Sequence, residues 1–157
     1  MDNECSTIIK DFITGEQKIN IQFVEAHQHR VNASERAIQT FKNHFVAGLC
    51  TVDKNFPLQL WCDLLLQAEM SLNLLRTART NPGLSAYAVL NGVFNFNKTP
   101  LAPPGTKALV FNDPTTRTSW QTHANDAWYV GPAMDHYRCY RFWTPETRGY
   151  RIAQTAR

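Results

Sequence analysis

A proline-rich segment at residues 98–106 divides the chain into two parts with different hydrophobic patterns. It contains Pro100, Pro103, Pro104 and Gly105, residue types that interrupt both helices and strands. Before it, apolar residues recur mostly at helical spacing. After it, short apolar and aromatic runs are separated by turn signals, a pattern typical of β-strands. The sequence therefore predicts an α/β chain with two domains, residues 1–97 and residues 98–157, the second being the linker and a small antiparallel β module.

Four helices and one strand are predicted before the linker. The helix over residues 33–50 has the clearest pattern, because its apolar residues recur on one side. They are Ile38, Phe41, Phe45 and Leu49. Further helices are predicted over residues 7–13, 58–77 and 85–90, and residues 18–24 alternate apolar and polar side chains as a strand does.

The β module combines aromatic residues with arginines. Strands are predicted over residues 107–111, 128–130, 137–143 and 150–152. In the third strand, Arg141 falls on one face and Arg138 on the other. We expect the aromatic side chains to form the core of a small barrel through cross-strand pairs. The two arginines are candidates for DNA binding, because a guanidinium group binds phosphate through two hydrogen bonds.

The net charge of +3 is unevenly distributed. Residues 1–97 carry 8 Lys/Arg and 9 Asp/Glu, whereas residues 98–157 carry 8 Lys/Arg and 4 Asp/Glu. A net charge of +4 in the last third is compatible with a surface that faces nucleic acid, and equally with an ordinary, modestly basic surface.

Several classes of protein are excluded by composition. No apolar run approaches the roughly 18–20 residues of a membrane span, so no membrane partner is expected. The first residues lack the pattern of a secretion signal. The four cysteines have no CxxC spacing, and so predict neither a zinc ribbon nor a disulfide framework.

Two carboxylates, Asp2 and Glu35, are the candidates for metal chemistry. They are separated by 32 residues, and Glu35 lies on the polar side of the predicted helix at residues 33–50. Mg²⁺ takes oxygen ligands in octahedral geometry, which requires carboxylates from separate elements to meet. Spacing alone favours a simpler interpretation, in which Glu35 stabilises the helix start and Asp2 is an ordinary terminal residue.

Two motifs resemble the second half of a retroelement integrase catalytic core. Asp2-Asn3-Glu4 is similar to that family's D-N-G-like segment, and residues 32–37 are similar to its N-x-x-E-R-like helix start. The segments after this helix resemble copia-like retrotransposon polyproteins, so the likeness covers essentially the whole chain. They are residues 58–75, 100–106, 128–132, 137–140 and 144–147.

The resemblance implies part of a ribonuclease-H-like (RNase H-like) core, an incomplete mixed sheet with helices, over residues 1–97. It assigns Asp2 and Glu35 as catalytic residues that hold Mg²⁺ or Mn²⁺. The implied reaction is strand transfer, in which a DNA 3′-hydroxyl attacks a phosphodiester of target DNA. The implied DNA-binding residues on and beside the helix at residues 33–50 are Asn32, Arg36, Gln39 and Lys42.

The family's first catalytic aspartate and its amino-terminal zinc module have no counterpart in this sequence. We therefore expect a fragment of a retrotransposon integrase that is inactive alone. The implied partners are DNA, further copies of the chain or other integrase chains, and the implied location is the nucleus. Two alternatives stay open: a non-catalytic module for DNA binding or assembly, and an inactive remnant of a retroelement polyprotein.

Overall fold

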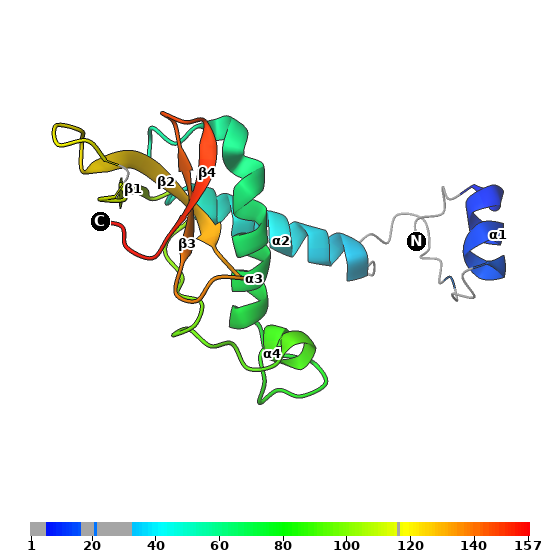
Figure 1. The fold of residues 1–157 in the computed structure, drawn as a ribbon. Helices are drawn as coiled ribbons and strands as arrows, with labels where there is room; N and C mark the ends of the chain where they lie inside the picture. Colours follow the sequence, from blue (N-terminus) through cyan, green and yellow to red (C-terminus); the bar gives the residue numbers. More distant parts are fainter. Residues whose placement is uncertain (1–5, 17–20, 22–32, 116) are drawn as a thin grey trace. The chain divides into compact units, whose positions relative to one another are not determined.

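The chain is a mixed α/β protein with a four-stranded antiparallel sheet (Figure 1). This computed structural model describes residues 6–16, 21, 33–115 and 117–157. The chain divides into two compact units, Met1–Lys42 and Asn43–Arg157. Of the strand predicted over residues 18–24, all but residue 21 lies outside the described residues. No helix in the described ranges is long and apolar enough to cross a membrane.

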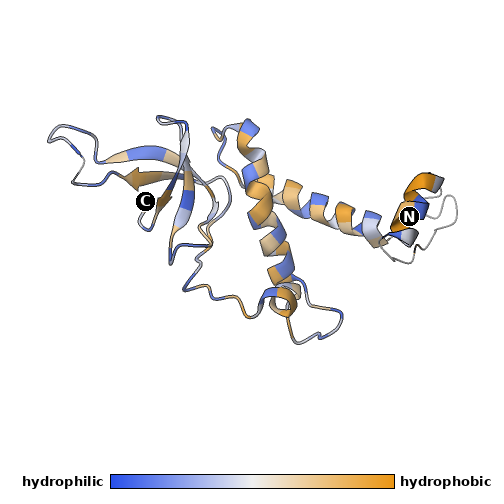
Figure 2. Ribbon diagram, turned by 45° about the vertical axis from the view of Figure 1, so that its right-hand side comes forward, coloured by the Kyte–Doolittle hydropathy of each residue, from blue (hydrophilic) through white to orange (hydrophobic). Residues whose placement is uncertain are grey.

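The first unit contains α1 (Thr7–Gly15) and the beginning of α2 (Ala33–Leu49), both predicted from the sequence. Helix α1 begins at Ser6, whose hydroxyl oxygen accepts a hydrogen bond from the Ile9 amide at 3.4 Å. Hydrophobic and hydrophilic residues alternate along α2, as its amphipathic sequence predicts (Figure 2).

The second unit continues with three helical segments. They are the 3₁₀ helix η2 (Leu58–Leu64), α3 (Leu65–Leu75) and α4 (Ala86–Asn91). The single α-helix predicted over residues 58–77 therefore begins as a 3₁₀ helix, because the Leu60 amide bonds to the Pro57 carbonyl three residues back (2.9 Å). Helix α4 is capped by Ser85 and ends at Gly92, which has φ 79°.

The sheet contains β1 (Lys107–Phe111), β2 (Ala124–Pro132), β3 (Tyr140–Thr144) and β4 (Gly149–Ala153), each paired with the next. The free edge of β1 is occupied by the last residues described. Leu109 and Arg157 exchange two backbone hydrogen bonds of 2.6 and 3.0 Å. The chain thus returns from β4 to β1, and the sheet curls toward a small barrel.

Strand β3 begins later than the sequence predicts. A strand over residues 137–143 would carry Arg138 on one face, but β3 starts at Tyr140 and Arg138 lies in the preceding turn with φ 57°. The prediction that Arg138 belongs to this strand is therefore wrong. A left-handed backbone conformation interrupts the extended chain at that position.

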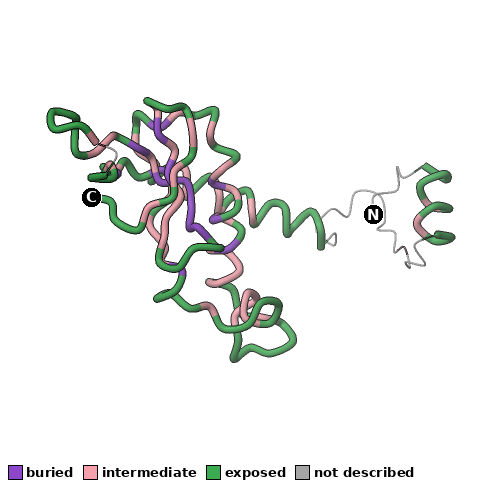
Figure 3. The backbone as a smooth tube through the Cα atoms, viewed as in Figure 1, coloured by how far each residue is buried: buried purple, intermediate pink, exposed green. Residues whose placement is uncertain are grey.

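The two faces of the sheet pack into two hydrophobic cores, and the buried part of the chain follows them (Figure 3). One core holds Val110, Ala127, Tyr129 and Phe142. The other joins Phe56 and Leu64 to Val130, with Trp128 and Trp143 packed beside them. Aromatic side chains thus form much of the core, as predicted, and helices share that second core with the sheet.

The proline-rich segment is packed within the second unit. The Gly105 amide donates to the Tyr129 carbonyl (2.9 Å), while the Gly105 carbonyl accepts from the Asp53 amide (3.2 Å). The Gln67 side chain donates from Nε2 to the Ala102 carbonyl at 2.6 Å. The segment therefore connects the residue 52–53 turn, α3 and β2, and the predicted boundary at residue 98 falls inside one compact unit.

Candidate nucleic-acid interface

The polar side of α2 presents the residues that the sequence assigns to metal and DNA. Glu35 lies in the first turn, where a carboxylate is stabilised by the positive end of the helix dipole. Glu35, Arg36, Gln39 and Lys42 are all exposed. Glu35, Gln39 and Lys42 follow one another at intervals of four and three residues, so they share one side of the helix.

Asp2 and Asn32 lie outside the described residues, so the pairing of Asp2 with Glu35 stays a prediction. The donor chemistry fits Mg²⁺ or Mn²⁺, because both groups are carboxylates and hard divalent cations prefer oxygen ligands. Within the described ranges, no group of three or more His, Cys, Asp or Glu side chains is arranged to hold a metal ion.

In the second unit, Arg138 lies beside Lys98. The Arg138 amide donates to the Lys98 carbonyl at 2.8 Å, although the two residues are 40 positions apart in the sequence. Both side chains are exposed, and neither makes an ion pair with any described residue. We call Lys98 and Arg138 the basic pair. Asp135, in the same turn as Arg138, adds one negative charge to the neighbourhood.

The turn that carries Arg138 has a defined backbone. The Ala133 amide donates to the Cys139 carbonyl, and the His136 amide donates to the Ala133 carbonyl, both at 3.1 Å. Arg138 adopts φ 57°, a conformation that costs a non-glycine residue about 1 kcal/mol. These bonds, together with the one to Lys98, hold the arginine backbone in that conformation.

Arg141, the second predicted DNA-binding residue of the sheet, is engaged within the protein. Its Nη2 lies 3.6 Å from Asp63 Oδ1, and its guanidinium carbon lies 5.3 Å from the centre of the Tyr150 ring. The Tyr150 hydroxyl donates to Asp63 Oδ2 at 2.7 Å. This hydrogen bond, with a smaller contribution from burial, raises the pKa of Tyr150. Arg141 therefore connects β3 to η2, and its charge is opposed by a carboxylate.

Other cations of the β module are similarly engaged. Lys107 pairs with Asp126 at 2.8 Å, and Arg151 donates to the Asn112 side chain and the Phe111 carbonyl at 2.8 and 2.7 Å. Lys98 is the functional candidate that sequence reasoning missed. Its position at the start of a proline-rich segment gave no sign that it meets Arg138.

No family model, curated protein or solved structure matches the chain. The integrase interpretation therefore depends on the sequence motifs at residues 2–4 and 32–37 and on the segments after α2. The geometry of the described residues is the independent ground on which a function can be proposed.

Proposed function

We propose that this chain is part of a retrotransposon integrase and that its described residues contribute by binding the DNA backbone. The observation that carries the proposal is the basic pair, two exposed basic residues whose backbones are joined by a hydrogen bond and whose side chains make no ion pair with any described residue. Cations in this arrangement attract phosphate without reading base sequence. Lys42 and Arg36 on α2 present further positive charge to solvent.

The catalytic part of the proposal concerns the RNase H-like core and its metal. Asp2 and Glu35 are proposed to hold Mg²⁺ or Mn²⁺, which would stabilise the negative charge that develops in phosphoryl transfer. Glu35 is an exposed residue in the first turn of α2.

The DNA-binding proposal is tested with two matched variants, Arg138→Gly and Arg148→Gly. Both arginines are exposed and have positive φ, 57° and 49°, so glycine removes one charge and relieves the same backbone strain in each. Affinity for a short DNA duplex would be measured by fluorescence anisotropy at about 50 and about 200 mM salt.

We expect affinity to fall steeply with salt, and Arg138→Gly to lower the slope of log affinity against log salt by about one. Arg148→Gly, which is outside the basic pair, should bind nearly as the unmodified chain does. Equal affinity at both salt concentrations, or equal losses in the two variants, would contradict the proposal.

The metal proposal has a separate measurement. Mn²⁺ binding to the full chain, followed by electron paramagnetic resonance, should be lost in Glu35→Gln while DNA affinity is retained or slightly increased. If the unmodified chain binds no Mn²⁺ but still binds DNA, the chain is instead a non-catalytic DNA-binding module.

A further inference from the structure

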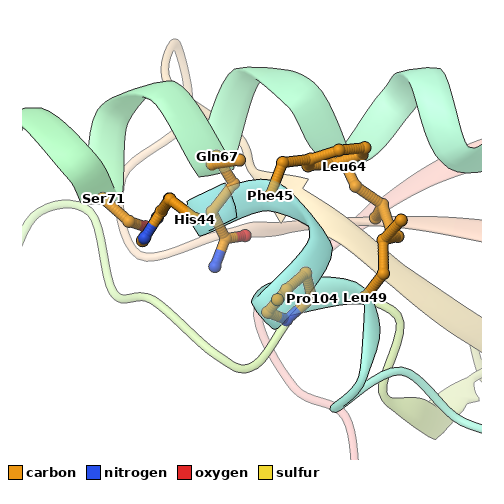
Figure 4. Close-up of a pocket in the computed structure, with 9 residues that line it drawn as sticks. His44, Phe45, Leu49, Leu64, Gln67, Ser71 and Pro104 are labelled. Atoms are coloured by element: carbon orange, nitrogen blue, oxygen red, sulfur yellow. The ribbon is translucent and has the colours of Figure 1, made fainter. Parts of the chain in front are cut away.

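A pocket of about 140 Å³ lies between the end of α2 and helix α3 (Figure 4). Its walls are mostly apolar and come from α2, η2, α3 and the proline-rich segment. The residues that line it include Phe45, Gly48, Leu64, Gln67, Ser71 and Pro104. All of them belong to the second unit, so the pocket is formed within one compact part of the chain.

The Gln67 amide is the distinctive feature of this pocket. The residue is only 4% exposed, and its Nε2 donates to the Ala102 carbonyl at 2.6 Å. That bond fixes which end of the amide faces the carbonyl, because only the nitrogen can donate. The other end, Oε1, is buried and accepts no hydrogen bond from any described residue.

A buried acceptor without a donor is costly, and a ligand that supplies a donor would remove that cost. In Figure 4 the Gln67 amide points from α3 toward Pro104, between the apolar end of the pocket at Leu49 and Leu64 and the polar end at His44 and Ser71. A ligand placed in this pocket would therefore lie against apolar walls, and Gln67 Oε1 is the buried acceptor without a donor among the side chains that line it.

The volume limits the size of the ligand. An apolar cavity of about 150 Å³ accommodates one benzene ring. The pocket is close to this size, and so limits a ligand to a single six-membered ring with at most one small substituent. We propose that it is a binding site for a small molecule consisting of one aromatic ring with one hydroxyl donor, the phenol class, with the hydroxyl donating to Gln67 Oε1. This inference is independent of the proposed DNA binding.

Phenol and benzene are the matched probes, since they share the ring and differ in the hydroxyl donor. Binding to the full chain would be followed by protein-observed NMR, using the signals of Phe45 and Leu64 to locate the ligand. We expect saturable binding at these residues, with phenol about five- to tenfold tighter than benzene because of the added hydrogen bond.

Gln67→Met keeps a side chain of similar length and removes the acceptor. We expect this variant to bind phenol and benzene equally. Gly48→Ala narrows the pocket instead, because an added Cβ at this position meets no heavy atom within 4 Å and takes up free space. It should weaken both ligands, and it should not reduce folding stability because alanine is the better helix former.

Gly15→Ala in α1 is the control for a glycine-to-alanine change, since its added Cβ also meets no atom within 4 Å. It should leave both affinities unchanged. The proposal is overturned if neither probe shifts the signals of Phe45 and Leu64, if the unmodified chain binds both alike, or if Gln67→Met keeps the preference for phenol. If Gln67→Met does not fold, full affinity in Gly48→Ala still overturns it.

Discussion

At the scale of single residues, Tyr129 makes the sheet core sensitive to alkaline pH. The residue is 1% exposed, and burial raises the pKa of its hydroxyl above the usual value of 10.0. The hydroxyl faces the Ala102 carbonyl, but that carbonyl already accepts from Gln67, and Tyr129 Oη makes no hydrogen bond of normal geometry with a described residue.

Whether alkaline pH raises or lowers the free energy of unfolding depends on which state, folded or unfolded, loses the Tyr129 hydroxyl proton at the lower pH. Above about pH 10 the unfolded chain ionises this tyrosine while the folded chain keeps it neutral, so the free energy of unfolding falls by up to about 1.4 kcal/mol per pH unit. Tyr129→Phe should remove that part of the decline and leave neutral-pH stability within about 1 kcal/mol. Urea unfolding across pH 7–11 tests this prediction, with Tyr137→Phe, at an exposed position, as the control. The prediction is contradicted if the free energy of unfolding declines equally at alkaline pH in Tyr129→Phe and in the unmodified chain.

The roles of single residues were only partly predictable. Aromatic side chains of the β module were predicted to form its core, and this is confirmed for Tyr129 and Phe142, with Trp128 and Trp143 packed against the second core, whereas Tyr137 and Tyr150 are exposed. The different roles of Arg138 and Arg141 could not be predicted, because they depend on contacts between residues that are far apart in the sequence. Arg141 meets Asp63, and Arg138 is bonded to Lys98. Whether Asp2 and Glu35 meet likewise depends on tertiary structure, and so stays a prediction.

At the scale of elements, Gly105 determines how closely the proline-rich segment approaches its neighbours. It has φ 68°, and an added Cβ would lie 2.5 Å from the Val52 side chain. Gly105→Ala therefore combines a strained backbone with a steric clash, and should lower the free energy of unfolding by about 2–3 kcal/mol. Gly92→Ala is the matched control, because it has φ 79° and open space around the added Cβ. Thermal or urea unfolding should show a larger loss of stability in Gly105→Ala than in Gly92→Ala. Equal losses of stability in the two variants would mean that backbone strain alone accounts for the effect.

Existence and type of most elements could be predicted because periodicity is a local property. The helices α1, α2 and α4 and the strands β1 and β4 lie close to the predicted ranges, whereas β2 begins four residues before the predicted range of 128–130 and ends two residues after it. The 3₁₀ start of the long helix was missed because Leu58–Leu64 is only seven residues long. Over so short a segment, the apolar spacing does not distinguish 3.0 from 3.6 residues per turn. The late start of β3 was missed because the turn depends on the bond between Arg138 and Lys98.

At the scale of the whole molecule, composition and packing divide the chain at different places. The composition changes at residue 98, yet residues 43–157 form one compact unit. The reason is the second core, in which Leu64 of η2 and Val130 of β2 pack together with Phe56. A linker identified by its prolines need not separate two cores, because proline restricts the backbone without preventing burial.

This shared core predicts that the helices and the sheet of the second unit unfold together. Leu64 is 1% exposed, so Leu64→Ala should lower the free energy of unfolding by about 2–5 kcal/mol. Leu66→Ala, at a position 54% exposed, is the control and should change it by less than about 0.5 kcal/mol.

The decisive measurement follows helix and sheet separately during urea unfolding. A background of Trp61→Phe and Trp120→Phe leaves Trp128 and Trp143, which both lie in strands and so report on the sheet by fluorescence. Circular dichroism reports on the helices. Because Trp128 and Trp143 pack against the core that contains Leu64, we expect Leu64→Ala to shift both midpoints by the same amount. If residue 98 is instead a folding boundary, Leu64→Ala will shift the helical signal and leave the tryptophan signal where Leu66→Ala leaves it.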